Sequence, residues 1–203
     1  MEVKDLIIEK AGDMFWHYGA RSVTMDDIAR ELSISKKTIY QYFRDKNELV
    51  RVVTHHSMEE ERLKGENIFE VSEDAIDELH MISQYMRDHM DSINPAWLFD
   101  LQKYHKDAWN IYLDYKQNVF QGLMANSIKR GIDEGYFRPE INAEILATFR
   151  IEQIEMAFND AVFPRSKFDF KEVQLQLLEL FVNGIITDKG RERLSAYIYK
   201  QHS

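Results

Sequence analysis

The stretch TMDDIARELSISKKTIYQYFRDKNEL, residues 24–49, has the layout of a short helix, a tight turn and a second short helix. Thr24 and Ser35 each precede a helical pattern and carry the hydroxyl side chain that favours an N-cap. Ser33 and Ile34 form the predicted turn between the helices. In a helix-turn-helix of this layout, the second helix enters the major groove of DNA. We therefore expect this stretch to bind DNA and the rest of the chain to control that binding.

The second helix of this stretch is predicted to bury one side and to expose the other. Ile39 and Phe43 are spaced i, i+4 and should face the core. Asp45 is the predicted cap of the next helix, and a lysine in the first turn of that helix suits a nearby phosphate. Exposed hydroxyl and ammonium groups hold phosphates, whereas glutamine and lysine read base edges. The predicted DNA-binding residues are Thr24, Ser35, Lys36, Lys37, Thr38, Tyr40, Gln41, Tyr42 and Lys46.

Over roughly its first fifty residues, the chain resembles the TetR family of bacterial transcriptional regulators. The chain departs from the family pattern at Ser33, where the family usually has glycine, and at Lys37, where the family often has a small residue. A serine in a left-handed turn costs about 1 kcal/mol, which a fold tolerates. The resemblance is carried by Phe15, Gly19, Val23, Thr24, Ile28, Ala29, Ile34, Ser35, Lys36, Thr38, Ile39, Tyr40, Tyr42, Phe43, Asp45, Lys46 and Leu49.

Charge is unevenly distributed along the chain. The formal net charge is -9 at pH 7, which is unusual for a DNA-binding protein. Residues 30–51 hold six basic and three acidic residues, a net of +3, whereas residues 59–78 hold two basic and nine acidic residues, a net of -7. Because salt screens charges beyond about 8 Å, a local basic surface is sufficient for phosphate contact. The acidic stretch is interpreted as a solvated helix face.

Several classes of protein are excluded by what the sequence lacks. The absence of cysteine excludes disulfides, thiolate chemistry and zinc fingers. Acids are interspersed near the N-terminus, and no apolar stretch approaches the roughly 18 residues of a membrane span. We therefore expect a cytoplasmic protein without a targeting peptide and with no membrane partner.

Enzymatic motifs are also missing from the sequence. No dinucleotide-binding, phosphate-loop or metalloprotease motif occurs, so we expect neither an enzyme nor a cofactor. His55, His56, Glu59 and Glu60 have i, i+4 spacings that could hold a metal. A solvated helix face is the commoner meaning of such a pattern, and we predict no metal site.

Helical patterns continue through the rest of the chain, and hairpin signals are absent. We expect an all-α fold with a three-helix, helix-turn-helix DNA-binding domain at residues 1–50. A larger helical domain for effector binding and dimerisation is expected at residues 51–203. Beyond the DNA-binding stretch, helices are predicted over about 45–64, 94–105, 142–162, 170–187 and 191–199. A further helix is predicted to begin at residue 72, and a long one is predicted to follow residue 105 and to end near residue 135.

The helices predicted at 142–162 and 170–187 are apolar on more than one face, which indicates burial on more than one side. A core alone would explain this pattern. We favour a core together with a two-fold interface, because helix-turn-helix proteins usually bind paired half-sites as symmetric dimers. The resemblance also implies that the last two long helices of each subunit form a four-helix interface. The residues expected to include the two-fold contacts are Ile151, Ile154, Phe158, Leu177 and Phe181.

The middle of the chain is rich in large amphipathic side chains, which often line small-molecule pockets between helices. The alternative is that most of them are core or surface residues of a helical bundle. Glu152 interrupts an apolar stripe and is the best polar candidate, although it could instead pair with Arg150 or Lys129, or be exposed. The predicted ligand-binding residues are Tyr85, His89, Trp97, Tyr104, Trp109, Tyr112, Phe149 and Glu152.

These patterns together predict a homodimeric, ligand-responsive transcriptional regulator that binds a palindromic double-stranded DNA operator. A repressor released by a small, mostly apolar or aromatic molecule is the favoured form. The alternative is a helical ligand- or partner-binding module that does not bind DNA specifically.

Overall fold

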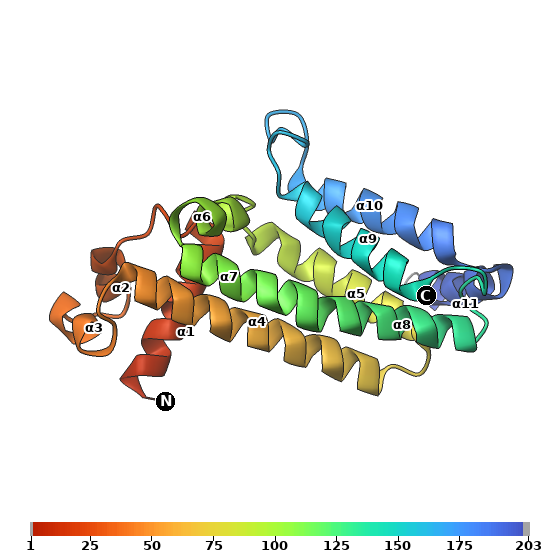
Figure 1. Cartoon of the computed structure of the whole chain (residues 1–203), viewed down its shortest axis with the longest axis horizontal. Helices are drawn as coiled ribbons and strands as arrows, with labels where there is room; N and C mark the ends of the chain where they lie inside the picture. Colours follow the sequence, from red (N-terminus) through yellow and green to blue (C-terminus); the bar gives the residue numbers. More distant parts are fainter. Residues whose placement is uncertain (1, 201–203) are drawn as a thin grey trace. The chain divides into compact units, whose positions relative to one another are not determined.

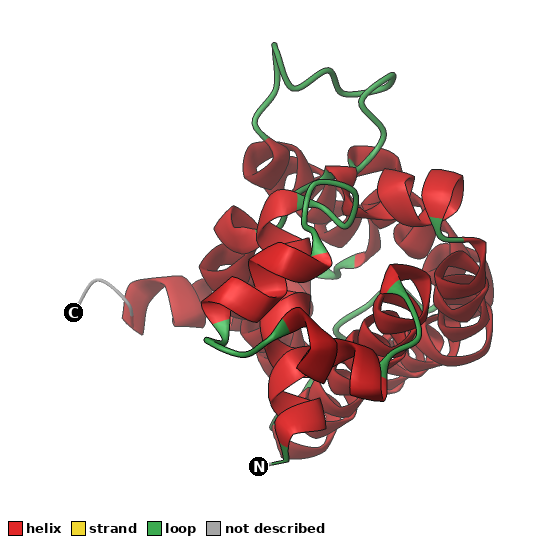
Figure 2. Cartoon of the chain, turned by 90° about the vertical axis from the view of Figure 1, so that its left-hand side faces the viewer, coloured by secondary structure: helices red, strands yellow, loops and turns green. Residues whose placement is uncertain are grey.

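The computed structural model describes residues 2–200, and their secondary structure is helical throughout (Figure 2). This confirms the predicted all-α class. In the described part of the chain, the only β-type pairing is an isolated bridge between Phe137 and Ile186. The helices are α1 (Val3–Tyr18), α2 (Met25–Glu31), α3 (Lys36–Tyr42), α4 (Lys46–Val71), α5 (Ala75–His89), α6 (Ala96–Tyr104), α7 (Lys106–Tyr115), α8 (Gln121–Asp133), α9 (Ala143–Ala157), α10 (Phe170–Ile185) and α11 (Asp188–Lys200).

The helices group into two compact units, and each is described by itself. Unit 1 comprises Met1–Glu61 and Ser92–Tyr115, and unit 2 comprises Arg62–Asp91 and Lys116–Ser203. The chain passes between the units within α4, and it passes again on either side of α6 and α7. The units therefore do not follow a single cut near residue 50. A DNA-binding domain over residues 1–50 and an effector and dimerisation domain over 51–203 remain a prediction about function.

Unit 1 is built around α1, with α2 and α3 packed against it. Helix α1 ends at Gly19, whose φ of 82° lies in the left-handed region that favours glycine. The chain then turns over α6, where Asp100 Oδ2 accepts a hydrogen bond of 3.0 Å from the backbone N–H of Arg21. The core of this unit includes side chains that are at most 1% exposed: Ile7, Phe15, Ile28, Ile39, Phe43, Leu49, Val53, Trp97 and Leu101.

Helix α4 is longer than the sequence pattern predicted. It continues to Val71 instead of ending near Lys64, and Gly65 lies within it. Arg62 and Glu66 form an i, i+4 ion pair that supports this part of the helix. The next helix, α5, is capped by Asp74, which accepts from the N–H groups of the two residues after Ala75. The prediction of a helix starting at Ser72 was therefore two to three residues early.

Unit 2 surrounds a second hydrophobic core. Helices α5, α8, α9 and α10 lie alongside one another, with α9 and α10 adjacent (Figure 1). The core side chains come from all four helices and from the segments before α9 and α11. They are Ala75, Ile76, Met86, Ala125, Ile128, Phe137, Ala143, Ala147, Leu178, Phe181, Val182, Ile185 and Ile186.

Two predicted helices in the second half of the chain differ from the structure. The predicted long helix ending near Gly135 is α7 and α8 joined by a π-helical segment at Lys116–Phe120. A π segment adds a residue to the helical turn, and simple periodicity does not reveal it. Helix α9 ends at Ala157 instead of reaching Val162, and an irregular connection leads on to Asp169, the cap of α10.

Candidate DNA-binding surface and effector site

Helices α2 and α3 form the predicted helix-turn-helix. Thr24 caps α2 in a capping box: its hydroxyl accepts from Asp27 N–H at 3.2 Å, and Asp27 Oδ2 accepts from Thr24 N–H at 2.9 Å. Ser35 caps α3, with its hydroxyl accepting from Thr38 N–H at 3.0 Å. Between the helices, Ser33 has a φ of 53°, so the expected left-handed turn residue is present.

Helix α3 presents a polar outer face. Ile39 is fully buried and Phe43, which follows the helix, is 1% exposed, so both face the core as predicted. On the other side, Tyr40 is 45% exposed and Tyr42 is 42% exposed. Large aromatic side chains left in solvent on a seven-residue helix are unusual unless they contact a partner. Thr24, Ser35, Lys36, Lys37 and Gln41 are also exposed, and Thr38 is partly exposed.

Two of the predicted DNA-binding lysines already have partners within unit 1. Lys36 Nζ lies 2.7 Å from Asp26 Oδ2, and this exposed pair can exchange with a phosphate at small cost. Lys46 Nζ donates to the carbonyl of Arg21 at 3.2 Å. Partial burial lowers the pKa of Lys46 below the ordinary lysine value, although nearby Asp100 and Asp27 oppose that shift. Sequence reasoning did not anticipate this contact, because Arg21 lies 25 positions away from Lys46.

Comparison with known proteins places this geometry in a family. Residues 7–53 match the model described as "Bacterial regulatory proteins, tetR family". The chain belongs to the TetR family. It is a DNA-binding, helix-turn-helix transcriptional regulator.

Relatives with similar sequences match this chain over most of their length. YvaF of Bacillus subtilis, an HTH-type transcriptional regulator, is 26% identical over 171 residues, which cover 83% of this chain and 88% of that protein. The transcriptional repressor KstR2 of Mycobacterium tuberculosis is 22% identical over 146 residues, covering 70% of this chain and 73% of the repressor. Among solved structures, a transcriptional regulator from Saccharomonospora viridis in complex with choline has a TM-score of 0.71 at 19% identity, covering 91% of this chain and 97% of that one.

The ligand-binding residues predicted for this TetR-family chain fall in both units. In unit 1, Trp97 is 1% exposed and packs against Phe15 and Trp16, with ring centroids 6.2 and 5.3 Å away. Its indole N–H is buried and has no acceptor among the described residues. Trp109 stacks on Tyr112 with centroids 5.1 Å apart. The fourth predicted ligand-binding residue in unit 1 is Tyr104, which is 39% exposed, and the guanidinium of Arg21 lies over its ring.

The other predicted ligand-binding residues lie in unit 2. Tyr85 stacks on His89 with centroids 4.2 Å apart, and the hydroxyl of Tyr85 accepts from Lys64 Nζ at 3.2 Å. Phe149 is 51% exposed. Glu152 is also exposed and lies 2.7 Å from Lys116 Nζ. Of the alternatives left open for Glu152, exposure is correct, and its ionic partner is a lysine that the sequence did not suggest.

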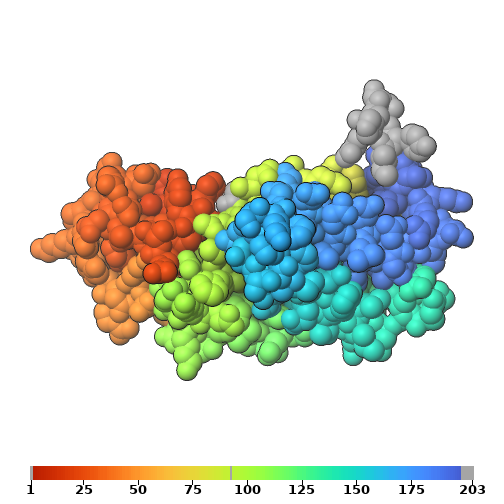
Figure 3. Space-filling view, turned by 90° about the horizontal axis from the view of Figure 1, so that it is seen from above, coloured from red at the N-terminus to blue at the C-terminus, as the bar shows by residue number. Residues whose placement is uncertain are grey.

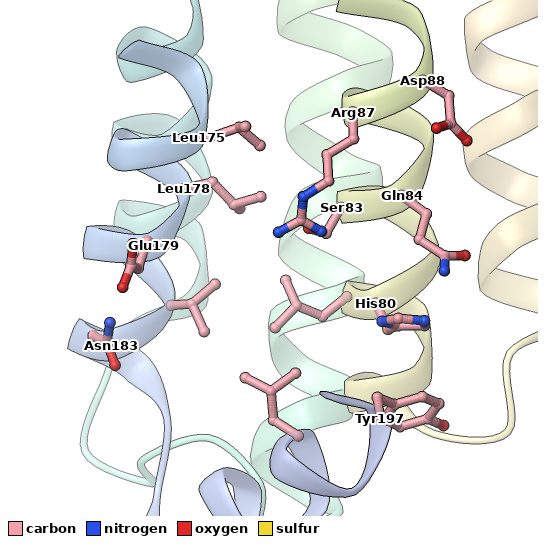
Figure 4. A pocket seen from close by; sticks show the side chains of 13 residues that line it. His80, Ser83, Gln84, Arg87, Asp88, Leu175, Leu178, Glu179, Asn183 and Tyr197 are labelled. Carbon is pink, nitrogen blue, oxygen red and sulfur yellow. The ribbon is translucent and has the colours of Figure 1, made fainter. Parts of the chain in front are cut away.

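Unit 2 contains a groove of about 820 Å³ between α5, α10 and α11. Leu175 and Leu178 line one wall from α10, while Ser83 and Arg87 line the other from α5 (Figure 4). The described lining includes none of the eight predicted ligand-binding residues. Most of the predicted ligand-binding residues are aromatic, whereas this groove is lined mainly by leucines and by polar residues of α5.

An exposed apolar surface runs along α9 and α10, which form a continuous outer face in the space-filling view (Figure 3). Ile145 and Leu180 are each 66% exposed, and Phe149 is 51% exposed. Phe181, which was expected at a two-fold contact, is instead 8% exposed and belongs to the core of unit 2. Phe158 packs edge-on against Phe170 with centroids 4.7 Å apart. The outward-facing apolar set is therefore Ile145 and Phe149 of α9 together with Leu180 of α10.

The two adjacent histidines of α4 have neighbours within unit 1. His56 Nε2 lies 3.7 Å from Glu60 Oε1, and His55 packs edge-on against Tyr115. Residues 2–200 contain no grouping of three or more potential metal ligands. Within the same residues, no helix has both the length and the apolar character needed to cross a bilayer.

Proposed function

We propose that this TetR-family regulator acts as a homodimeric repressor in the bacterial cytoplasm and is released from a palindromic operator by a small-molecule effector. The observation that carries DNA recognition is the outer face of α3. It leaves two tyrosines, two lysines and a glutamine in solvent, while Ile39 and Phe43 anchor the helix from inside.

The proposed contacts divide into two chemical groups. Thr24, Ser35, Lys36, Tyr40, Tyr42 and Lys46 would hold phosphates through hydroxyl and ammonium groups. Lys37, Thr38 and Gln41 would approach base edges, since lysine pairs with guanine and glutamine with adenine. Lys46 would have to leave the Arg21 carbonyl, 3.2 Å away, in order to reach a phosphate.

Effector control is supported by the groove of unit 2 and by the relatives. Its volume of about 820 Å³ is in the range of small-molecule sites, and its lining combines leucines with polar side chains that would orient a ligand. The choline-bound neighbour shows that a protein of this fold holds a small molecule. KstR2 is a transcriptional repressor, which supports the same direction of control here.

Dimerisation is proposed to occur through the outer face of α9 and α10. A symmetric pair of α3 helices must lie about 34 Å apart, or a multiple of that distance, to enter successive major grooves. Ile145, Phe149 and Leu180 give this face enough exposed apolar surface to favour association.

The proposal is tested by fluorescence anisotropy with DNA fragments selected from a random pool by the purified protein. We expect selected DNA to bind at least about 10³-fold more tightly than random DNA at physiological salt. The alternative is a helical ligand-binding module, which would bind both DNAs equally, and this binding would disappear at moderate salt.

A further inference from the structure

Arg150 carries a buried charge that has no hydrogen-bond or ion-pair partner in the described part of the chain. Its side chain lies on the inner face of α9 and is 2% exposed. Among residues 2–200 no hydrogen bond or ion pair reaches it, and its Nη1 atom is fully enclosed. Burial lowers the pKa of the guanidinium to about 10, which still leaves it charged at neutral pH. An enclosed charge of this kind is strongly unfavourable unless an anion compensates it.

The acids closest to Arg150 in sequence are already occupied. Glu152 and Glu155 both pair with Lys116, the first residue of the π-helical segment. Glu152 Oε1 is 2.7 Å from Lys116 Nζ, and Glu155 also accepts a hydrogen bond from that ammonium group. The third acid of α9, Glu144, lies near Lys129, so all three acids of this helix have lysine partners and none of them pairs with Arg150.

The seam between α9 and α10 holds two more unsatisfied polar groups. Gln174 is fully buried, and its Nε2 donates to the carbonyl of Ile154 at 3.0 Å. The Oε1 atoms of Gln174 and Gln153 are both enclosed and have no partner among the described residues. Buried polar groups are normally hydrogen-bonded, so three such groups on one pair of helices call for an explanation.

The surroundings of Arg150 are otherwise apolar. Its guanidinium carbon lies 5.8 Å from the centroid of the Phe181 ring. Phe181 and Ala147 both belong to the hydrophobic core of unit 2. A molecule bound here would meet one positive charge, two hydrogen-bonding amides and a hydrophobic wall.

We propose that Arg150, assisted by Gln153 and Gln174, binds the carboxylate of an organic acid with an apolar body. This inference rests on the proposed function, because the acid would be an effector. Its site lies apart from the groove between α5, α10 and α11, whose lining includes none of these three residues. A guanidinium offers two parallel N–H donors that match the two oxygens of a carboxylate. One guanidinium also balances one negative charge, whereas a phosphate dianion would leave an excess charge in the core.

Gln153 and Gln174 supply the remaining hydrogen-bonding groups of the proposed carboxylate site. Gln174 Oε1 can accept a hydrogen bond from a hydroxyl group of the ligand, because the other end of its amide is already engaged. Gln153 can turn its amide to donate to the carboxylate. A quaternary ammonium ion such as choline has no carboxylate, and its positive charge would be repelled by Arg150.

The test measures thermal unfolding of the full chain with butanoate, octanoate, dodecanoate, octadecanoate or phenylacetate, and with the primary amide of each. At least one acid should raise Tm by about 5–10 °C at a hundred times its Kd. The matching amide and choline should leave Tm unchanged.

Two variants assign the effect to the guanidinium. Arg150→Met should unfold without ligand at the same or a higher Tm, because it removes an uncompensated charge, and it should lose the acid-induced shift. Arg150→Lys keeps the charge and should bind the acid about tenfold or more weakly. Arg138→Met is the control, since Arg138 is 47% exposed and pairs with Glu140.

Four results would overturn the inference: no shift with any acid, equal shifts with the amides, an unchanged shift in Arg150→Met, or a marked loss of Tm in ligand-free Arg150→Met and Arg150→Lys alike. DNA binding by the same samples separates this inference from the proposed function. Specific DNA binding without acid binding would reject the carboxylate site alone. Acid binding without specific DNA binding would reject the proposed function and leave the site standing.

Discussion

Gln41 is exposed on α3 and is the residue best suited to read a base. An amide that bonds both polar atoms of adenine discriminates by about 1–3 kcal/mol against the wrong base. Gln41→Ala should therefore relax preference at one operator position while leaving the salt dependence of binding unchanged. Anisotropy with single-base operator variants measures this. Gln102→Ala, on the exposed side of α6, is the control. Unchanged base preference in Gln41→Ala would remove Gln41 from the recognition surface.

Lys46 tests the phosphate contacts. If its ammonium group reaches a phosphate, Lys46→Ala should weaken binding to all sequences and reduce the salt slope by about 1. Since Lys46 also donates to Arg21 in the free protein, thermal unfolding must accompany the titration. If Lys46→Ala bound DNA as tightly as the parent across the salt series, Lys46 would stabilise the fold and would not contact DNA.

His105 gives unit 1 a pH-dependent stability. Its ring is 8% exposed, and its Nδ1 shares a hydrogen bond of 2.8 Å with Asn47 Oδ1. Burial, and then the charge of Lys46, lower the pKa of His105 below its ordinary value of 6.5. The unfolded chain then binds the proton more readily, so this contribution is present above that ordinary pKa and is lost as pH falls below it.

The measurement for His105 is denaturant unfolding between about pH 5 and 8. The parent should lose stability toward the acid end, and His105→Gln should lose less. His17→Gln, at an exposed position, is the control and should follow the parent. Identical profiles for the parent and His105→Gln would mean that the buried histidine does not contribute.

Residues with local signals were the most predictable from the sequence. Thr24 and Ser35 cap their helices as expected, because capping depends on the residue itself and its next three neighbours. The partners of Lys46 and Glu152, and the lack of a described partner for Arg150, were not predictable, since each depends on which distant segments meet.

At the level of elements, the turn between α2 and α3 carries measurable strain. Ser33 has a φ of 53°, where a side chain costs about 1–2 kcal/mol relative to glycine. The greater freedom of glycine in the unfolded chain offsets about 0.4–1 kcal/mol of this. Ser33→Gly should therefore raise the unfolding free energy by about 0.5–1 kcal/mol, and Ser33→Val should lower it. Chemical denaturation measures both, and a less stable glycine variant would contradict the strain argument.

The outer face of α9 and α10 is the proposed dimer element. Ile145→Glu and Leu180→Glu each place a charge on a side chain that is 66% exposed, so the protomer should still fold. We expect both variants to be monomeric by light scattering and to lose operator binding, because one half-site gives too little affinity. Leu63→Glu, 52% exposed on α4, is the control. Dimers that survive both substitutions would place the interface elsewhere.

The periodicity of apolar residues predicted most of these helices. It did not predict where the helices end or which side of each one is buried. It found α9 and α10, yet it placed Phe181 outside, although Phe181 lies in the core of unit 2. It also missed the π segment at Lys116–Phe120, because one extra residue in a turn shifts the helical phase. The error at Phe181 arises because α10 is apolar on more than one side, so that the pattern does not define a single buried face.

At the scale of the whole molecule, effector and DNA must influence each other equally. If an effector lowers DNA affinity about 5- to 150-fold, the DNA must lower effector affinity by the same factor. This holds whichever site the effector occupies, and calorimetric titration of the free protein and of the protein–DNA complex measures it. Equal affinities in the two titrations would mean that the bound molecule is not the effector.

Sequence-specific DNA binding by a pair of chains is the central claim, and one titration tests it most directly. Labelled DNA selected by the protein is titrated with the parent chain at several salt concentrations, with random DNA of equal length as competitor, and the stoichiometry is read at saturation. The account predicts two chains per site, a preference of about 10³-fold or more over random DNA, and affinity that falls steeply with salt. Equal affinity for selected and random DNA would contradict it.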